Sequence, residues 1–438
     1  MMSAIRQLLL LRLLISAVVL SFHLSVSATS LQEAFDNAVK VDPTLRASRF
    51  NQEATKENLV IAKSRLFPQV SLQGASNQLT QTTTQDIPGS ISVSRSFTGP
   101  SVNHQLVIRQ GLLRPKDIYG LNFAELQAKY GQVKYQADLS DLWTRVTFSW
   151  IDLVGAAQLV EVYERPLKSL LAAAKQENSR LTQGDGTRDA AIEAEAQYQL
   201  AVATHHQALQ ILKSKQRAFE VLTQVDTKPI LSLRLELNPT PKFSEIDRDR
   251  LWINAREKSF DIRFAELQEL MQRERVRMSK ADHLPSLDVI ASWNVAKNDA
   301  TSTQGYRYSN NQVGIQYTVP IYSGGLISAA ARQASLALEA SLAEKEAVSN
   351  RVEGEFRALW ASWLGQIARV RAGFQMMESS REQLKASELS HLHGVKTLME
   401  VANAELTFSR RLADQVNLVM EYQKYTARVS RTDFNLEK

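Results

Sequence analysis

The 438-residue chain contains no cysteine, which excludes disulfide bonds, zinc–thiolate sites and cysteine nucleophiles. Its 52 basic and 46 acidic residues give a formal net charge of +6, which is spread along the chain rather than gathered in a block. Nucleic acid is therefore not expected as a partner. The sequence also lacks a glycine-rich phosphate loop, a nucleophile elbow and a recognisable pair of catalytic carboxylates. We accordingly expect neither enzyme activity nor a bound cofactor.

Histidine is scarce and poorly placed for binding a metal. His205 and His206 are neighbours, and His391 and His393 lie two positions apart. Side chains on a helix meet at spacings of three or four, so neither pair faces a common ligand site. No metal site is expected.

Long hydrophobic runs are absent beyond the N-terminus. Residues 1–28 predict a secretory signal peptide, because Arg6 and Arg12 precede an apolar run over residues 13–20 and Val26-Ser27-Ala28 offers small residues for cleavage. The run is shorter than the ~20 residues that a membrane-spanning helix needs, which disfavours the alternative of an anchor helix. An exported chain can still enter a membrane through β-strands.

What the sequence does contain is an internal repeat. Residues 29–225 and 244–438 each predict a helical stretch, two strands around a polar loop, a very long helix and a shorter helix, with residues 226–243 as a linker. Landmarks recur at an offset of roughly 210–217 positions, which is the signature of a duplicated unit. These landmarks are Leu66-Phe67-Pro68, which returns as His283-Leu284-Pro285, and Gly184-Asp185-Gly186-Thr187, which returns as Gly394-Val395-Lys396-Thr397.

Four segments alternate between apolar and mostly uncharged polar residues, at about residues 68–79, 101–110, 285–297 and 311–320. Such alternation over about ten residues is typical of membrane barrel strands, although edge strands of a soluble sheet show it too. The occurrence of two matched pairs favours a barrel. Four strands cannot close one, so a dimer with about eight strands or a trimer with about twelve is required. The polar residues 80–100 and 298–310 predict long exposed loops.

The predicted helices are too long for a compact globular domain. Helical patterns extend over residues 115–183 and 325–393, and at about 1.5 Å per residue each helix would span roughly 100 Å. Pro166 should kink or break the first of them. Shorter helices are expected over residues 31–66, 187–225, 244–283 and 397–436. A coiled-coil seam is predicted from alternating steps of four and three at Ala191, Glu195, Tyr198, Val202, His205, Leu209, Leu212, Gln216 and Phe219.

Three motifs carry a resemblance to a known family. They are Val319-Pro320-Ile321-Tyr322-Ser323-Gly324-Gly325, the run from Thr397 to Glu405 after Gly394, and Gly184-Asp185-Gly186-Thr187. With the duplicated pattern of strand pairs and long helices, they resemble the TolC family of outer-membrane channel-tunnels over nearly all of residues 30–438. Together with Arg109-Gln110-Gly111-Leu112-Leu113-Arg114-Pro115, the Gly-acid-Gly-Thr turn looks most like members that serve type I protein secretion.

The resemblance implies a fold, an assembly and a set of partners. Three protomers would share one 12-stranded barrel in the outer membrane, and their helices would form a tunnel across the periplasm of a Gram-negative cell. The tunnel would taper near residues 184–190 and 394–403, and residues 226–243 would belong to a belt around its middle. A periplasmic adaptor and an inner-membrane ABC transporter, or a proton-driven pump, would dock on this passive duct.

The resemblance also implies an entrance gate. The family rings its narrow entrance with two acids one helical turn apart, and these map here to Glu400 and Asn403, so one acid is kept. Three copies of Glu400 would attract cations, as charged rings do in channels. The alternative is that Glu400 is an ordinary solvated carboxylate on a helix, without a role in a gate.

A latch between the two helix turns is implied as well. In the family a basic residue of the second turn bonds to polar residues of the first, and the matching positions are Lys396 and Asp189-Ala190, beside Arg188. The family often has an acid where Ala190 stands, and here Asp189 is offset from it by one. His391 occupies a further tip position. A Lys396–Asp189 pair near water would contribute at most about 1 kcal/mol, which suits a gate that has to open.

The preferred interpretation is thus an outer-membrane exit duct for type I protein secretion. Multidrug or small-molecule efflux is the alternative within the family, and a soluble periplasmic coiled-coil adaptor is the alternative from another class. A soluble adaptor would explain the helices but not the four alternating strands.

Overall fold

The computed structural model describes residues 31–86, 89, 92–244, 247–298 and 306–431, so the expected signal peptide lies outside the described residues. The chain forms two compact units. The first contains residues up to 46, residues 139–252 and residues from 356 onward, and the second contains residues 47–138 and 253–355. Each unit thus combines segments of both sequence repeats. Within the described residues, no helix has the length and apolar character needed to cross a membrane.

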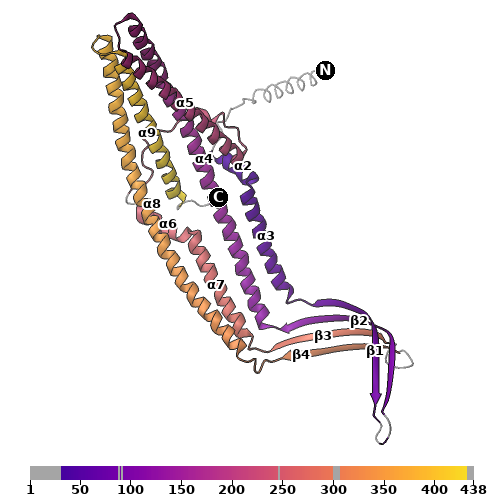
Figure 1. Cartoon of the computed structure of the whole chain (residues 1–438). Helices are drawn as coiled ribbons and strands as arrows, with labels where there is room; N and C mark the ends of the chain where they lie inside the picture. The colour runs from indigo at the N-terminus through magenta and orange to yellow at the C-terminus, as the bar shows by residue number, and fades with distance from the viewer. Residues whose placement is uncertain (1–30, 87–88, 90–91, 245–246, 299–305, 432–438) are drawn as a thin grey trace, which may run out of the picture. The chain divides into compact units, whose positions relative to one another are not determined.

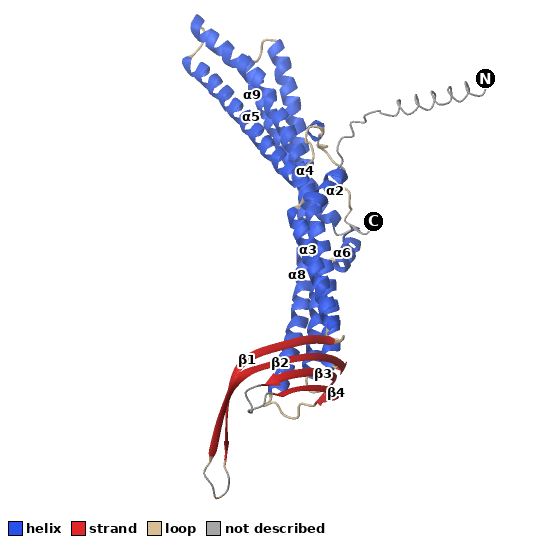
Figure 2. Cartoon of the chain, turned by 90° about the vertical axis from the view of Figure 1, so that its right-hand side faces the viewer, coloured by secondary structure: helices blue, strands red, loops and turns tan. Residues whose placement is uncertain are grey.

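The second unit contains one antiparallel sheet. Its strands lie in the order β1-β2-β3-β4, and they are β1 (Gln69–Gln85), β2 (Val93–Leu113), β3 (Ser286–Asn298) and β4 (Tyr306–Thr318). The ladder between β2 and β3 joins the two sequence repeats. Figures 1 and 2 show β1 and β2 continuing as a hairpin past the ends of β3 and β4.

This hairpin corrects the prediction of a loop over residues 80–100. Residues 80–85 and 93–100 are strand, and their hydroxyls pair across the hairpin, as between Thr80 and Thr98 at 2.9 Å. Threonine is a polar residue but also a β-branched one, and cross-strand threonine pairs stabilise strands. The composition that suggested a loop therefore suits an exposed hairpin equally well.

The register gives the sheet one apolar and one polar face. On the two edge strands β1 and β4 the apolar side chains are strongly exposed in the single chain, with Leu72 at 73% and Val313 at 79%, whereas several of those on β2 and β3 are half-buried. What we call the apolar face consists of Val70, Leu72, Leu106, Ile108, Val289, Ala291, Trp293, Val295, Val313, Ile315 and Tyr317. The opposite face carries Ser71, Gln73, Gln105, Asn294, Gln312 and Gln316.

Four helices or helix segments of the second unit lead to and from this sheet. They are α3 (Pro43–Ser64), the first part of α4 (Pro115–Gln183), α7 (Phe260–Ala281) and the first part of α8 (Leu326–Leu392). Polar contacts tie them in pairs: Ser48 of α3 donates to Asp138 of α4 at 2.6 Å. Lys345 of α8 donates to Glu269 of α7 at 2.9 Å. The Glu269 carboxylate is buried, whereas the Lys345 side chain is partly exposed.

The helices expected over residues 31–66 and 244–283 are each broken in two. The break separates α2 (Leu31–Val41) from α3, and α6 (Asp247–Lys258) from α7. Asp42 accepts a hydrogen bond from the Leu45 backbone N–H at 2.9 Å, and Ser259 accepts one from Ile262 at 3.4 Å. Both are N-cap interactions that begin a new helix. The single-helix prediction was wrong because it overlooked these caps.

The first unit packs the remaining parts of α4 and α8 against α5 (Arg188–Thr223) and α9 (Leu398–Arg431). Pro166 lies inside α4 without ending it, so of the two expected effects, a kink or a break, the break does not occur. Asp152 of α4 accepts hydrogen bonds from Lys215 of α5 at 2.7 Å and pairs with Lys424 of α9 at 2.9 Å. One carboxylate thus ties three helices together.

The buried seam of α5 is shifted by one residue from its predicted position over the middle of the helix. Tertiary contacts bury Ala194, Ala201 and Ala208, whereas the predicted member Glu195 is exposed. Ala201 packs with Leu170 of α4 and Ala402 of α9. Alanines let helices approach closely. The predicted seam members Ala191 and Phe219 are buried as expected, whereas three of the nine predicted positions, Glu195, Val202 and Leu209, lie one residue after the buried alanine.

The linker over residues 226–243 contains one 3-10 turn, η1 (Ile230–Ser232), and is bound to the helices by two glutamines. Gln158 of α4 accepts from the Leu235 backbone N–H at 3.0 Å. The fully buried Gln415 of α9 donates to the Leu237 carbonyl at 2.6 Å and to the Val370 carbonyl of α8 at 3.1 Å. The linker therefore lies along both repeats within the first unit.

Candidate functional site

The predicted gate residues lie on two helix turns at the same end of the first unit (Figure 1). Gly184 between α4 and α5 and Gly394 between α8 and α9 both adopt left-handed conformations, with φ of 85° and 72°. Asp185 donates its backbone N–H to the Arg180 carbonyl at 2.9 Å. An equivalent bond, also of 2.9 Å, joins Val395 to Ser390. These are the hydrogen bonds of a Schellman motif, which needs glycine at the left-handed position.

A threonine begins the helix after each turn. The Thr187 hydroxyl accepts from the Ala190 backbone N–H at 3.3 Å, and the Thr397 hydroxyl accepts from the Glu400 N–H at 3.2 Å. Only the second turn is a capping box, because the Glu400 carboxylate in return accepts from the Thr397 N–H at 2.8 Å.

Glu400 is therefore both exposed and held in place. The hydrogen bond from the Thr397 backbone N–H, followed by that from the Thr397 hydroxyl, lowers the pKa of the Glu400 carboxyl below its ordinary value. A negative charge is also favourable at a helix N-terminus. The side chain is thus an ionised acid at a defined position. Asn403 lies one turn further along α9 and adds no charge.

Lys396 and His391 are bonded within their own turn. The Lys396 ammonium donates to the hydroxyl of the buried Ser387 at 2.9 Å. The His391 Nδ1 is 2.8 Å from the Lys396 carbonyl oxygen, so this nitrogen carries the donating hydrogen. Lys396 is thereby folded back along the last turn of α8.

The turns do not form the expected latch within one chain. Arg188 and Asp189 lie in the first turn of α5 and are exposed. Among the described residues of this chain, the ion pairs within 4.0 Å do not include one between Lys396 and Asp189. A pair between neighbouring copies stays a prediction.

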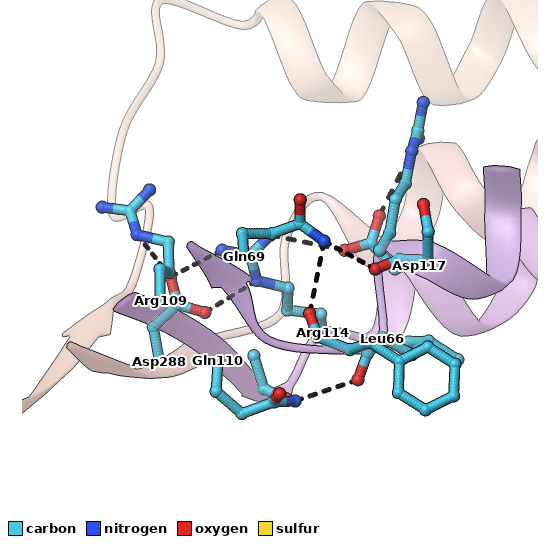
Figure 3. Close-up of polar contacts among 11 residues, drawn as sticks. Leu66, Gln69, Arg109, Gln110, Arg114, Asp117 and Asp288 are labelled. Atoms are coloured by element: carbon cyan, nitrogen blue, oxygen red, sulfur yellow. Dashed lines mark hydrogen bonds and ion pairs between the residues drawn. The ribbon is translucent and has the colours of Figure 1, made fainter. Parts of the chain in front are cut away.

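The strand-to-helix junction holds a second cluster, which the sequence alone did not reveal (Figure 3). Arg114 donates from Nε and Nη2 to the two oxygens of Asp288, each at 2.7 Å. The Arg109 Nε is 3.9 Å from the same carboxylate. Arg114 and Asp288 come from different repeats, so no local pattern could have paired them. A planar bidentate pair is specific in geometry as well as strong.

Two glutamines complete this junction (Figure 3). Gln110 donates to the Leu66 carbonyl at 2.9 Å, and Gln69 donates to the Ser64 carbonyl at 2.7 Å. A Cβ at Gly111 would lie 2.8 Å from the Arg114 side chain, so a larger residue would disturb the arginine. The motif from Arg109 to Pro115 thus joins the end of β2 to the start of α4.

Comparison with known proteins agrees with these features. The model of the family described as "Outer membrane efflux protein" matches residues 251–431. The outer membrane protein TolC of Vibrio cholerae is 24% identical over 92% of this chain and 90% of its own length. The alkaline protease secretion protein AprF of Pseudomonas aeruginosa is 25% identical over 90% of this chain and 82% of its own. The chain is related to the TolC family of outer-membrane channels.

Solved structures of low sequence identity share the fold of this chain. The outer membrane channel CmeC of Campylobacter jejuni superposes with a TM-score of 0.74 at 15% identity, covering 93% of this chain and 87% of CmeC. The outer membrane protein VceC of Vibrio cholerae gives a TM-score of 0.72 at 13% identity, covering 93% of this chain and 97% of VceC. The expected fold class, mainly helical with four strands, is confirmed.

The relationship also supports the expected location. The matched family and the similar proteins are described as outer-membrane proteins, which agrees with the location expected for this chain. Sequence reasoning missed Ser387 as the partner of Lys396 and Thr397 as a cap. The second had a readable signal, because Thr397-Leu398-Met399-Glu400 has the spacing of a capping box.

Proposed function

We propose that this chain is the passive outer-membrane exit duct of a tripartite export machine, with type I protein secretion as the preferred system. The observation that carries the proposal is the arrangement of two strand pairs with one apolar and one polar face, each continuing directly into long helices. The protease secretion proteins AprF and PrtF are 25% identical to this chain over most of its length, which favours protein cargo.

The active assembly is a homotrimer. Strands β1 and β4 are the edges of the sheet in the single chain, and open edges in lipid would leave backbone groups without partners. Three copies supply about twelve strands, enough for a barrel with an aqueous lumen. The apolar face would then contact lipid, and the polar face would line the lumen.

The duct performs no covalent chemistry. Energy comes from an inner-membrane ABC transporter that is coupled to the duct by a periplasmic adaptor. The helix turns at 184–190 and 394–403 form the periplasmic entrance. Three copies of Glu400 surround it, with Asn403 one turn away and Lys396, His391, Arg188 and Asp189 holding the closed state.

Small-molecule efflux is the second candidate. It is favoured by the description of the matched family and by the fold shared with the channel CmeC. The pump that docks on the duct separates the two candidates, because the duct itself contacts its cargo only loosely.

Cross-linked co-purification from the native envelope during active export tests the proposal. Recovery of an ABC transporter together with an adaptor supports protein secretion. Recovery of a proton-driven pump would support small-molecule efflux instead of protein secretion. A protein that remains in the soluble fraction after cell breakage would contradict the duct altogether.

A further inference from the structure

The apolar face of the sheet changes its chemistry along the strands. On β3 it is apolar from Leu287 to Val295, and the next residue on that face is Lys297. Eight residue steps at ~3.3 Å give about 26 Å along the strand, or about 20 Å at the usual tilt of a barrel strand. This is close to the ~25 Å apolar band of outer-membrane barrels.

Two cations lie side by side where the apolar part ends. The ladder places Lys297 of β3 directly opposite Arg307 of β4. Both side chains are exposed. By contrast, Asp288 at the other end of β3 is the one acidic residue within the four described strands. An ammonium and a guanidinium at neighbouring positions are suited to a phosphate, because the guanidinium can donate two parallel bonds to it.

Beyond the cations, the same face carries hydroxyls. Three hydroxyl pairs span the projecting β1–β2 hairpin, which Figure 2 shows past the ends of β3 and β4. The pairs are Thr80 with Thr98 at 2.9 Å, Thr82 with Ser96 at 3.2 Å and Thr84 with Ser94 at 2.8 Å. The β1–β2 register is unbroken, and Val102 lies opposite Lys297, so the hydroxyls and the cations share one face of the ladder.

The order of these groups matches one kind of lipid. An apolar band, then two cations, then a row of hydroxyls corresponds to acyl chains, then phosphate, then sugar. We propose that this face binds a phosphorylated glycolipid of the outer leaflet, with Lys297 and Arg307 on a phosphate and the hairpin hydroxyls against the sugars. The proposal rests on the proposed membrane insertion of the sheet.

The opposite face of the hairpin provides the matched control. Arg95 lies on β2 opposite Thr83, and both belong to the other face of the ladder. An Arg95→Gln substitution therefore removes a cation from the same hairpin without touching the proposed site. It separates a specific site from a general effect of net charge.

Native mass spectrometry of the assembled protein in detergent tests the site. The probes are bisphosphorylated lipid A, its dephosphorylated form, lipopolysaccharide in which lipid A carries further sugars, and phosphatidylglycerol. We expect the wild type and the Arg95→Gln variant to retain bisphosphorylated lipid A best. The Lys297→Gln/Arg307→Gln variant should retain on the order of tenfold less, because charge-assisted contacts are lost. Thr80→Val/Thr82→Val should weaken retention only of glycolipid that carries further sugars.

Two results would overturn the site. Equal retention by the wild type and the double variant would remove the role of the cations. Equal retention of phosphatidylglycerol and lipid A by the wild type would show a general preference for anionic lipid. Channel recordings in planar bilayers keep this test separate from the proposed function. A protein that conducts but shows no lipid preference loses only the glycolipid site, whereas one that never inserts contradicts the duct.

Discussion

At the scale of single residues, two charged groups of this chain are held by specific hydrogen-bond partners. Arg114 and Asp288 form a bidentate pair at the strand-to-helix junction, and Glu400 is bonded into a capping box at a helix turn. Arg109, near Arg114, makes a longer contact with the same Asp288 carboxylate, and Asn403, one turn from Glu400, carries no charge. Single substitutions can therefore distinguish a specific geometry from mere charge.

The Arg114–Asp288 pair should contribute to stability. Arg114→Ala leaves a largely buried carboxylate without its main partner, and we expect a loss of about 1–3 kcal/mol in the free energy of unfolding. Denaturant unfolding of the detergent-solubilised protein measures it. Arg109→Ala is the control, because its contact with Asp288 is 3.9 Å long. Equal losses in the two variants would mean that the bidentate geometry has no special value.

Glu400 should set the ion preference of the entrance. Because its pKa is lowered by the Thr397 hydrogen bonds, the carboxylate stays charged at neutral and mildly acidic pH. Cation preference should be complete above the ordinary carboxyl range near ~4.3 and be lost as the pH falls through the lowered value. Reversal potentials in planar bilayers measure this. Glu400→Gln should lower the preference at pH 7, and Asn403→Asp should raise it. If the Glu400→Gln channel were as cation-selective as the wild type, the three Glu400 carboxylates would not be the source of the cation preference.

At the scale of elements, small residues and one shared carboxylate decide how the helices of the first unit pack. Ala201 lies where α4, α5 and α9 meet, and Asp152 binds lysines from α5 and α9. Both contacts join parts of the two sequence repeats. Neither is visible in the pattern of a single helix.

Overpacking tests which positions of α5 are buried in its seam with the neighbouring helices. Ala201→Leu inserts a larger side chain among Leu170, Ala173 and Ala402, and should destabilise the protein by about 1–3 kcal/mol. Ala203→Leu, two residues further along on an exposed position, should have a much smaller effect. Unfolding of the two variants under identical conditions gives the comparison. A larger loss for Ala203→Leu would contradict the observed phase.

Asp152 should make stability depend on pH. Burial by itself would raise the pKa of this carboxyl, but hydrogen bonds from Lys215 and Lys424 outweigh it and lower the pKa below its usual value. The stabilisation is therefore present above the unfolded value near ~3.9 and is lost as the pH falls through the folded value.

We expect Asp152→Asn to cost on the order of 1 kcal/mol at pH 7 and progressively less below pH ~4. Thermal unfolding across this pH range measures the difference. Glu421→Gln, which removes only an exposed partner of Lys424, is the control. A constant difference between wild type and Asp152→Asn at every pH would rule out the linkage.

At the scale of the whole molecule, the single chain is incomplete in ways that assembly would resolve. The sheet has two open edges and a strongly exposed apolar face. Lys396 is bonded to Ser387 of its own chain rather than to Asp189. If the latch forms, it forms between neighbouring protomers.

The latch prediction concerns conductance. Lys396→Ala or Asp189→Ala should make the closed channel leakier, because a contact between neighbouring turns is lost. A pair near water contributes at most about 1 kcal/mol, so the change should stay within roughly fivefold. Single-channel recordings measure the open probability, and Ser387→Ala shows whether the bond within the chain matters instead. Unchanged conductance in both Lys396→Ala and Asp189→Ala would exclude the latch.

Much of this protein was determined by its sequence alone. The duplicated pattern, the alternation of the strand segments and the turn motifs around Gly184 and Gly394 predict the mainly helical fold with four strands, and the relationship to known channels confirms that fold class. These features are local, because hydrophobic period, left-handed glycine and strand alternation each act within a few residues. The predicted gate residues stay predictions, since they concern an assembly of several chains.

Tertiary structure alone decided which distant segments meet. It paired Arg114 with Asp288, placed alanines rather than Glu195 in the seam of α5, and built each compact unit from both repeats. It also turned the polar segment after residue 79 into a projecting hairpin. The physical reason is the same in each case. Contacts between residues far apart in sequence depend on the packing of whole elements, and a local pattern carries the period of an element but not the identity of its neighbour.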